Sequence, residues 1–450
     1  MDTRFAMHNT HLDGLDRFIE QDPQLRRLKA QRYQHRSTLL DELPTSTPGI
    51  YTVGGGRQIG KTTLLKQWMQ ELMQAGVTPA SLAFLSGELI DDHHSLMFLL
   101  KNQLANMPTN QTQFLLIDEI TYIKDWDKAI KYAADSGLLD NVVLLLTGSD
   151  LTLMQEARMR FPGRRGKASV VNFHLYTLSF REVVQLKHAN IKDPSMDLLF
   201  SEFENYLIHG GYLTAINNLA MDGCILGSTL MTYSDWIRGD MIKRGKQDHY
   251  LREILNAIIK RYGSQITWNA LGHDLSIDHP KTIADYISLL ESMDAIFVQS
   301  ALLEDKLTGA PKKARKVMFT DPFVYHAIQA WLSPVNDPYK QQILPLLQNS
   351  VACSILVEYC AVTHYRRHYP TYYIKAEGEV DVAYVKNKTF WPVEIKWTEQ
   401  IREKNLKQTL KYSNALILTK NTSAGSLQHI PTQPLPLALW NMTQPNMVVE

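Results

Sequence analysis

A glycine-rich segment between a predicted strand and a predicted helix constrains the fold of this chain more than any other feature. Residues 55–62 read GGRQIGKT and match the pattern G-x-x-x-x-G-K-[ST] in full. The apolar run at residues 50–53 predicts a strand before it, and residues 62–74 have the pattern of a helix. Such a turn presents backbone N–H groups and the positive end of a helix dipole to an anion. The segment therefore predicts a phosphate-binding loop.

The residues of this loop have separate expected roles. Lys61 would bridge the β- and γ-phosphates of ATP, and the Thr62 hydroxyl would bind Mg²⁺. ATP and Mg²⁺ are thus the predicted ligands. The expected nucleotide-binding set is Gly55, Gly56, Arg57, Gln58, Ile59, Gly60, Lys61, Thr62 and Thr63.

A second apolar run, at residues 114–117, ends in two acids. We expect Asp118 to coordinate Mg²⁺ through water and Glu119 to orient and polarise the attacking water. The strand predicted at residues 142–146 leads into Thr147 and Ser149, and either hydroxyl suits a sensor of the γ-phosphate. The sequence does not choose between the two hydroxyls. Ser149 joins Glu119 in the expected catalytic set.

The order of predicted elements indicates an α/β fold. Strand-like runs at residues 50–53, 82–85, 114–117 and 142–146 alternate with longer helical stretches, as in a parallel sheet of the P-loop NTPase type. The run at 82–85 lies between the loop and Asp118, and a glutamate directly follows that aspartate. This order favours the ATPases with an inserted strand over the small GTPases.

Several motifs together resemble those of a known group. The segments GGRQIGKTTLL, LLIDEI, LLLTGS, GRRGK, LYTLSFREV and YLIHGGYL are similar to motifs of bacterial and archaeal AAA-type ATPases, which join a P-loop domain to a winged-helix region and an uncharacterised C-terminal domain. The resemblance extends over nearly the whole chain and implies ATP hydrolysis. Two positions depart from the group: Gly56 stands where proline is frequent, and Leu213 follows the Gly-Gly-Tyr turn where proline is common. The second departure weakens any role of that turn in nucleotide binding.

The predicted segments are an N-terminal helical lead (1–45), a P-loop ATPase core (46–180), a helical lid (181–262), a winged-helix region (263–332) and a C-terminal α/β nuclease-like domain (340–435). In the winged-helix region two helical patterns at residues 266–293 precede two short strand-like runs. Its second helix carries Lys281, Asp285 and Glu291, which is not a strongly basic face. A structural or protein-contacting role is therefore at least as well supported as DNA binding, although the basic run at 312–316 keeps DNA binding open.

A short segment after Ser149 is rich in cations, namely Arg158, Arg160, Arg164, Arg165 and Lys167. An arginine can stabilise the charge on a phosphoryl group during its transfer, either from the same chain or from a neighbouring subunit. Arg164 matches the Gly-Arg position of the group that the chain resembles and is the preferred candidate. The cluster could instead bind nucleic-acid phosphates or form a solvated loop.

The C-terminal segment contains the pattern of the PD-(D/E)xK nucleases. Asp381 is followed after twelve residues by Glu394-x-Lys396. Side chains two apart on a strand share a face, so Glu394 and Lys396 can meet Asp381, with Mg²⁺ held by the acids and water positioned by the lysine. Glu358, on a preceding predicted helix, matches a position where such folds often add an acid. The alternative is a charged hairpin that binds a protein partner and cleaves nothing.

Composition sets the remaining expectations. The 47 Lys and Arg nearly balance the 46 Asp and Glu, so a uniformly basic surface is excluded while local basic segments are not. No apolar run reaches the roughly 18 residues of a membrane span, and no signal peptide is evident. We therefore expect a cytoplasmic protein with no membrane partner, with DNA or RNA as a possible partner and with its oligomeric state open. His364 and His368 share a helical face and are expected to lie at the surface.

Overall fold

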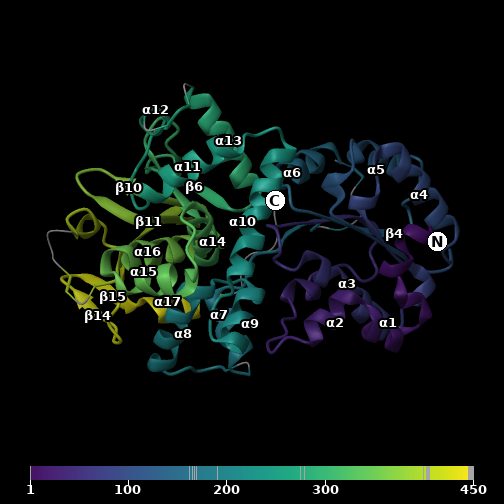
Figure 1. The fold of residues 1–450 in the computed structure, drawn as a ribbon, viewed down its shortest axis with the longest axis horizontal. Coiled ribbons are helices and arrows are strands. Elements are labelled where there is room, and N and C mark those ends of the chain that lie inside the picture. Colours follow the sequence, from purple (N-terminus) through teal and green to yellow (C-terminus); the bar gives the residue numbers. More distant parts are fainter. Residues whose placement is uncertain are drawn as a thin grey trace. The chain divides into compact units, whose positions relative to one another are not determined.

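The computed structural model describes residues 2–161, 163–164, 166, 168, 170–189, 191–273, 275–277, 279–398, 400–401 and 406–443 (Figure 1). The chain divides into two compact units, at residues 1–176 and 177–446. Each unit is described by itself.

The first unit is built on a five-stranded sheet in the order β2-β3-β4-β1-β5. Every neighbouring pair of these strands is parallel. The strands are β1 (Gly49–Gly54), β2 (Leu82–Ser86), β3 (Gln113–Asp118), β4 (Val142–Gly148) and β5 (Asn172–His174). The fold-class prediction is confirmed. The order places the ends of β1 and β3 on either side of β4, so the loop after β1 and the acids after β3 share one edge of the sheet.

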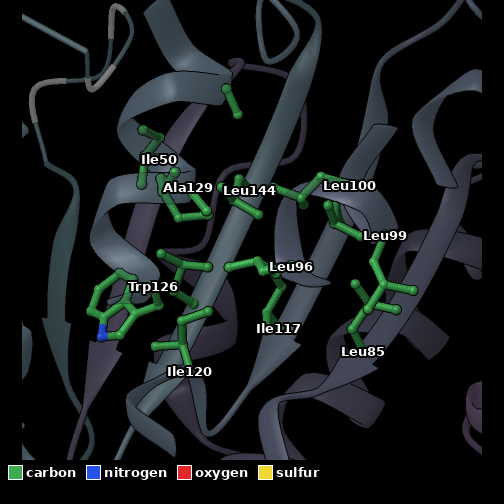
Figure 2. Close-up of a cluster of buried hydrophobic side chains, with 14 of the residues drawn as sticks. Ile50, Leu85, Leu96, Leu99, Leu100, Ile117, Ile120, Trp126, Ala129 and Leu144 are labelled. Atoms are coloured by element: carbon green, nitrogen blue, oxygen red, sulfur yellow. The ribbon is translucent and has the colours of Figure 1, made fainter. Parts of the chain in front are cut away.

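Helices cover both faces of this sheet, which explains why its strands are almost wholly apolar. They are η1 (Thr3–His8), η2 (Thr10–Asp13), α1 (Leu15–Gln21), α2 (Pro23–Lys29), η3 (Thr38–Asp41), α3 (Lys61–Gln74), η4 (Pro79–Ser81), η5 (Gly87–Leu89), α4 (His93–Ala105), η6 (Ile120–Tyr122), α5 (Trp126–Asp135) and α6 (Leu151–Arg160). Figure 2 shows the core on one face, where Leu96, Leu100 and Trp126 belong to one buried cluster with Leu144 of β4. On the other face α1–α3 form a second core around Phe18 and Trp68.

The second unit combines helices with a mixed sheet. Its helices are α7 (Phe180–Lys187), α8 (Met196–His209), α9 (Leu213–Asp222), α10 (Gly227–Lys243), α11 (Asp248–Lys260), α12 (Trp268–Gly272), α13 (Pro280–Ser292), α14 (Pro322–Leu332), η7 (Tyr339–Ile343), α15 (Leu344–Gln348), α16 (Ser350–Arg366), η9 (Thr409–Lys411) and α17 (Leu435–Asn441). The strands β6 (Ile296–Ser300) and β9 (Arg315–Phe319) form an antiparallel ribbon, and β7 (Leu302–Leu303) pairs with β8 (Thr308–Gly309).

A six-stranded sheet in the order β10-β11-β12-β13-β15-β14 forms the last part of this unit. Its strands are β10 (Thr371–Lys375), β11 (Glu379–Lys386), β12 (Thr389–Lys396), β13 (Leu416–Thr419), β14 (Gly425–Leu427) and β15 (Ile430–Pro434). Strands β10, β11 and β12 are antiparallel, whereas β13 runs parallel to β12 and to β15. Helix α16 packs against β11 and β12.

The expected surface position of His364 is wrong. This side chain is 1% exposed; its Nε2 accepts a hydrogen bond from the Phe180 N–H at 3.0 Å, and its Nδ1 donates to the Cys360 carbonyl at 2.7 Å. Burial lowers the pKa of His364 to about 3. Helix α7 covers the face of α16 that carries His364. The spacing of residues along the sequence does not indicate this contact.

The described residues contain no single helix with both the length and the apolar composition of a membrane span. One bent pair of helical segments, Tyr339–Gln348 and Ser350–Arg366, meets the length and composition criteria together. The two segments are bent by 88° relative to each other.

Candidate nucleotide site and a second carboxylate site

The predicted phosphate loop turns from β1 into α3, as its glycines require. Gly60 has φ +99° immediately before Lys61 begins the helix, a conformation that favours glycine. At Gly55 a Cβ atom would lie 2.5 Å from the Leu175 carbonyl oxygen and 2.5 Å from the Ile59 side chain. No other residue type fits at Gly55 without moving the backbone of its neighbours.

Asp118 connects the loop to two strand ends. Its Oδ2 accepts a hydrogen bond from Thr62 Oγ1 at 2.6 Å, and its Oδ1 accepts one from Thr147 Oγ1 at 2.5 Å. Burial raises the pKa of Asp118 above its usual value, while these two hydrogen bonds oppose the increase. The structure thus brings together Thr62 and Asp118, the two predicted Mg²⁺ ligands.

Glu119 lies at the same edge and is held by different groups. Its Oε2 accepts a hydrogen bond from Ser149 Oγ at 2.9 Å, and its Oε1 lies 3.3 Å from Lys61 Nζ. Burial raises the pKa of Glu119, but the positive charges of Lys61 and Arg57 outweigh this effect and leave the pKa lowered. Glu119 has φ +51°, a left-handed conformation that non-glycine residues seldom adopt and that functional sites often contain.

The two candidate sensor hydroxyls have different partners. Besides bonding to Asp118, Thr147 Oγ1 accepts a hydrogen bond from the Glu119 backbone N–H at 3.0 Å. The Ser149 hydroxyl and backbone N–H both donate to the Glu119 carboxylate, the latter at 3.2 Å. Thr147 therefore orients Asp118, the predicted Mg²⁺ ligand, and Ser149 orients Glu119.

Lys61 is 5% exposed and donates to the Gly55 and Gly56 carbonyl oxygens at 3.1 and 2.7 Å. Arg57, which follows Gly56 in the loop, donates a hydrogen bond from its guanidinium to the Tyr122 hydroxyl. The guanidinium lies 5.4 Å from the centre of the Tyr122 ring. Tyr122 belongs to η6, directly after the acids. Sequence reasoning did not single it out, because no pattern distinguishes it from an ordinary strand-end aromatic.

Arg164, the arginine predicted to stabilise the transferred phosphoryl group, lies apart from these residues. Its guanidinium pairs with Asp135, at the end of α5 where the chain returns to the start of β4. The nearby Gly166 contacts the backbone of Pro48 and Gly49, at the start of β1. Both contacts belong to the edge of the sheet opposite the phosphate loop.

The other described cations of the basic segment also have partners. Arg158 is buried and donates from Nε to Thr52 Oγ1 at 2.9 Å, and Arg160 pairs with Asp127 at 2.6 Å. Arg165 and Lys167 lie outside the described residues.

The Gly210-Gly211-Tyr212 turn has a packing role within the second unit. A Cβ atom at Gly211 would lie 2.1 Å from the Leu178 carbonyl oxygen. The Gly211 N–H donates to Asp321 Oδ2 at 2.9 Å, and burial raises the pKa of Asp321 to about 6.

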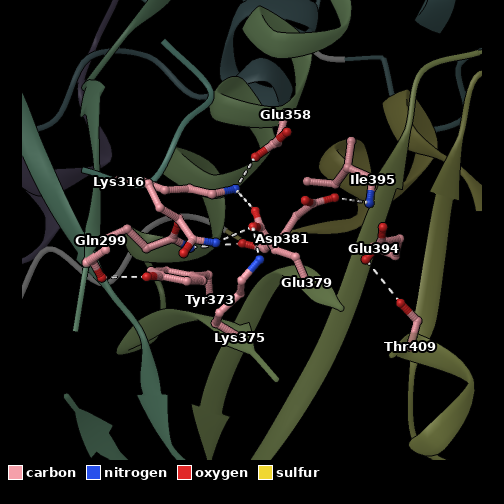
Figure 3. Close-up of polar contacts among 12 residues, drawn as sticks. Gln299, Lys316, Glu358, Tyr373, Lys375, Glu379, Asp381, Glu394, Ile395 and Thr409 are labelled. Atoms are coloured by element: carbon pink, nitrogen blue, oxygen red, sulfur yellow. Dashed lines mark hydrogen bonds and ion pairs between the residues drawn. The ribbon is translucent and has the colours of Figure 1, made fainter. Parts of the chain in front are cut away.

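The second unit contains the predicted nuclease-like residues in one place (Figure 3). Asp381 on β11 accepts a hydrogen bond from the Ile395 N–H at 2.9 Å. Lys396 on β12 contacts Glu394 directly and lies 3.9 Å from Asp381 Oδ2. Glu394 also accepts a hydrogen bond from Thr409 Oγ1 at 3.1 Å. Burial, reinforced by the negative charge of Asp381, raises the pKa of Glu394 to about 8.

Glu358 on α16 faces a different set of neighbours. One carboxylate oxygen from each of Glu358, Glu379 and Asp381 lies within 4.8 Å of the other two. Glu394 is not part of this set, although the sequence pattern paired it with Asp381. Lys316 on β9 pairs with Glu358 at 2.8 Å and contacts Glu379. Burial and Asp381 raise the pKa of Glu358 to about 7.

Glu379 and Lys316 were not predicted as site residues. Glu379 stands two residues before Asp381 on one strand, so alternation places both on the same face and could have indicated it. Lys316 belongs to the basic run at 312–316 that keeps DNA binding open, but this side chain is 1% exposed and so cannot contact a nucleic acid in this conformation. Arg315 beside it lies over the Trp268 ring at 4.8 Å, which leaves Lys312 and Lys313 as the exposed cations of the run.

Two family models match parts of the chain. Residues 47–184 match an AAA domain, and residues 201–334 match a domain of unknown function (DUF8612). An uncharacterised protein of Haemophilus influenzae is 25% identical over 261 residues, which are 55% of this chain and 61% of that protein. The chain thus spans less than two thirds of this relative.

Solved structures with similar folds share little sequence with this chain. A Walker-type ATPase of Pyrococcus abyssi is 14% identical and aligns with a TM-score of 0.42 over 62% of this chain and 91% of its own. The Orc1 protein of Aeropyrum pernix, solved in complex with DNA, is 12% identical and aligns with a TM-score of 0.33 over 71% of this chain and 92% of its own. At these TM-scores neither similarity carries a functional conclusion. The family match, the parallel sheet and the phosphate loop together identify residues 47–184 as an AAA-type P-loop domain.

Proposed function

We propose that the AAA-type domain binds ATP with Mg²⁺ and hydrolyses it. The observation that carries this proposal is the hydrogen bond between Thr62 and Asp118, which joins the helix after the phosphate loop to the acid at the end of β3. This hydroxyl and this carboxylate are the oxygen ligands expected for Mg²⁺ in P-loop ATPases. Bound there, Mg²⁺ would neutralise charge on the β- and γ-phosphates.

The surrounding side chains support a division of roles. Lys61 already lies among the carbonyl oxygens of its own loop, and its ammonium would exchange these contacts for phosphate oxygens. Glu119 has a lowered pKa and so stays ionised at neutral pH, as a general base requires. Ser149 fixes one oxygen of that carboxylate and leaves its orientation defined. Thr147 performs the same function for Asp118.

Replacement of Lys61 by Ala tests nucleotide binding. The loss of a buried ammonium that binds phosphate is worth up to ~3 kcal/mol, so we expect the Kd for ATP to rise by roughly 100-fold. Isothermal titration calorimetry with Mg²⁺ and a slowly hydrolysed ATP analogue measures this change. Lys128→Ala is the matched control, because Lys128 is 60% exposed and pairs with a residue of its own turn, Asp125. Equal affinity of the Lys61 and Lys128 variants would contradict the assignment.

We further propose that the C-terminal domain is nuclease-like and acts on or binds DNA or RNA. Three carboxylates within 4.8 Å of one another, with Lys396 beside Asp381, support this proposal. Such oxygen donors suit Mg²⁺ or Mn²⁺, which would supply Lewis-acid activation of a phosphodiester. Lys396 would position water, and Glu394, which contacts its ammonium, would hold the lysine in place.

The winged-helix region is proposed to span α12, α13 and the β6–β9 ribbon. Asp285 of α13 pairs with Lys246, and Glu291 accepts a hydrogen bond from the Val298 N–H at 2.8 Å. These internal contacts support a structural role for the acidic side chains of α13, and Lys312 and Lys313 are then the residues through which a nucleic acid would be contacted.

The alternative proposal is an ATP-dependent switch whose C-terminal domain only recruits a protein partner. A cleavage assay on single- and double-stranded substrates with Mg²⁺ or Mn²⁺ separates the two. A nuclease loses its activity in both Asp381→Ala and Lys396→Ala and keeps it in Lys388→Ala, which changes an exposed residue of the β11–β12 turn. No cleavage by the wild type or by Lys316→Met, which removes the ammonium from the carboxylate cluster, would exclude the nuclease half of the proposal and leave the ATPase half.

A further inference from the structure

A buried lysine from the β6–β9 ribbon lies inside the nuclease-like carboxylate cluster. Lys316 Nζ is 2.8 Å from Glu358 Oε1 and contacts Glu379, and the whole residue is 1% exposed (Figure 3). Its partner across the ribbon, Gln299, donates from Nε2 to the Asp381 carbonyl at 3.0 Å. One register pair of the ribbon therefore supplies two polar side chains to the cluster.

The ribbon is fastened to the sheet that carries the cluster. Ala301 forms a parallel bridge with Tyr373 on β10, and the Tyr373 hydroxyl donates to the Ala314 carbonyl. Gln265, just before α12, hydrogen-bonds Glu379. These contacts hold the ribbon on β10 and β11, so a shift of the ribbon against these strands would move the Lys316 ammonium out of the cluster.

The chemistry of the cluster matches that of a hard divalent cation. Glu358, Glu379 and Asp381 offer three carboxylate oxygens from two elements, and such oxygens are the usual ligands of Mg²⁺ and Mn²⁺. Buried carboxylates need compensating positive charge, and Lys316 supplies it here. Beside the cluster, the Gln299 Oε1 atom is buried and has no hydrogen-bond partner among the described residues, so one polar oxygen is still without a donor or cation.

We propose that the Lys316 ammonium takes the place of a divalent cation among Glu358, Glu379 and Asp381, so that the β6–β9 ribbon keeps this cluster closed to metal. Withdrawal of the ribbon, or loss of the ammonium, opens the cluster to Mg²⁺ or Mn²⁺. The ribbon lies within the residues that match the domain of unknown function, whereas the carboxylates lie beyond them. This inference rests on the proposed nuclease-like function, but it concerns metal occupancy and not cleavage.

Binding of Mn²⁺ to the full-length protein, followed by electron paramagnetic resonance of the free ion, tests the proposal. Lys316→Met is expected to bind one Mn²⁺ at least tenfold more tightly than the wild type. The matched control is Lys375→Met, since Lys375 is also near Glu379, at 3.9 Å, but is 48% exposed. Its Kd should stay within threefold of the wild-type value. Equal Mn²⁺ affinity of Lys316→Met and the wild type overturns the proposal.

Thermal unfolding provides a second measurement in case Lys316→Met folds poorly. In that variant a bound metal ion would restore the positive charge that the carboxylates lose with Lys316. Addition of about 1 mM Mn²⁺, a concentration near the Kd of a weak site, should raise the Tm of Lys316→Met more than that of the wild type. A variant that stays unfolded at every Mn²⁺ concentration also overturns the proposal. Tight Mn²⁺ binding by Lys316→Met without cleavage of any substrate supports the closed cluster and refutes only the nuclease. Cleavage by the wild type, with no gain in Mn²⁺ affinity in Lys316→Met, would support the nuclease and refute the closed cluster.

Discussion

The Thr147 hydroxyl is predicted to stabilise the folded AAA-type domain through Asp118. Thr147 is fully buried, donates to Asp118 Oδ1 at 2.5 Å and accepts from the Glu119 N–H at 3.0 Å. Thr147→Val keeps the shape and the β-branching of the side chain but removes both hydrogen bonds. A bond to a charged group is worth about 1.5–3 kcal/mol, and an unsatisfied buried N–H costs about 1–3 kcal/mol.

The two energy losses do not add in full. Asp118 keeps the hydrogen bond from Thr62, and its raised pKa reduces the cost of leaving its other oxygen unpaired. We therefore expect the free energy of unfolding to fall by about 3 kcal/mol. For a unit of this size that corresponds to a Tm decrease of about 6–12 °C. Calorimetry measures the decrease in the transition that shifts when ADP and Mg²⁺ are added.

Thr419→Val is the matched control for this prediction. Thr419 is also a buried strand threonine, 1% exposed, but its hydroxyl has no hydrogen-bond partner among the described residues. Removing that hydroxyl should leave stability unchanged or raise it by up to ~1 kcal/mol. If Thr147→Val and Thr419→Val have the same small effect, the hydrogen bonds around Asp118 do not stabilise the site and the reasoning is refuted.

Two further predictions concern a backbone contact and pH. Gly55→Ala should weaken ATP binding by at least roughly tenfold, since its Cβ would lie 2.5 Å from a backbone carbonyl oxygen, whereas Gly239→Ala, with open space around its Cβ, should not; equilibrium binding compares them. In the second unit burial lowers the pKa of His209, His326 and His368 to about 4 and of His364 to about 3. The unfolded chain then binds more protons below pH ~6.5, so stability is complete above that pH and is lost as pH falls toward 4, by at most about 5 kcal/mol per pH unit. Denaturant unfolding between pH 7 and 5 measures this slope, which should fall by about a quarter in His364→Gln. The slope would be absent if these histidines were protonated in the folded protein.

The nucleotide site was largely predictable because its signals are local. The loop at residues 55–62 and the acids after residues 114–117 are read from contiguous patterns, and parallel strands carry both to one edge of the sheet. The separate partners of Thr147 and Ser149 were not predictable. Two hydroxyls at the end of one strand look equivalent until the side chains of Asp118 and Glu119 are in place.

Residues that depend on distant segments were harder to predict. The partner of Arg164 is Asp135, which neither motif nor spacing connects to it. Lys316 stands in a run of cations that is typical of an exposed wing, and only the docking of the ribbon on β10 and β11 buries it. His364 follows the same rule, since α7 covers a helical face that has no unusual sequence pattern.

The turnover of Glu119→Gln tests the central claim most directly, because it separates ATP binding from hydrolysis in the AAA-type domain. The amide keeps the shape of the side chain and can still accept the hydrogen bond from Ser149, but it cannot act as a base. We predict that Glu119→Gln binds ATP and Mg²⁺ with nearly wild-type affinity, while its single-turnover hydrolysis rate falls by at least roughly 100-fold, as expected for loss of a general base. Hydrolysis by Glu119→Gln at the wild-type rate would contradict the account.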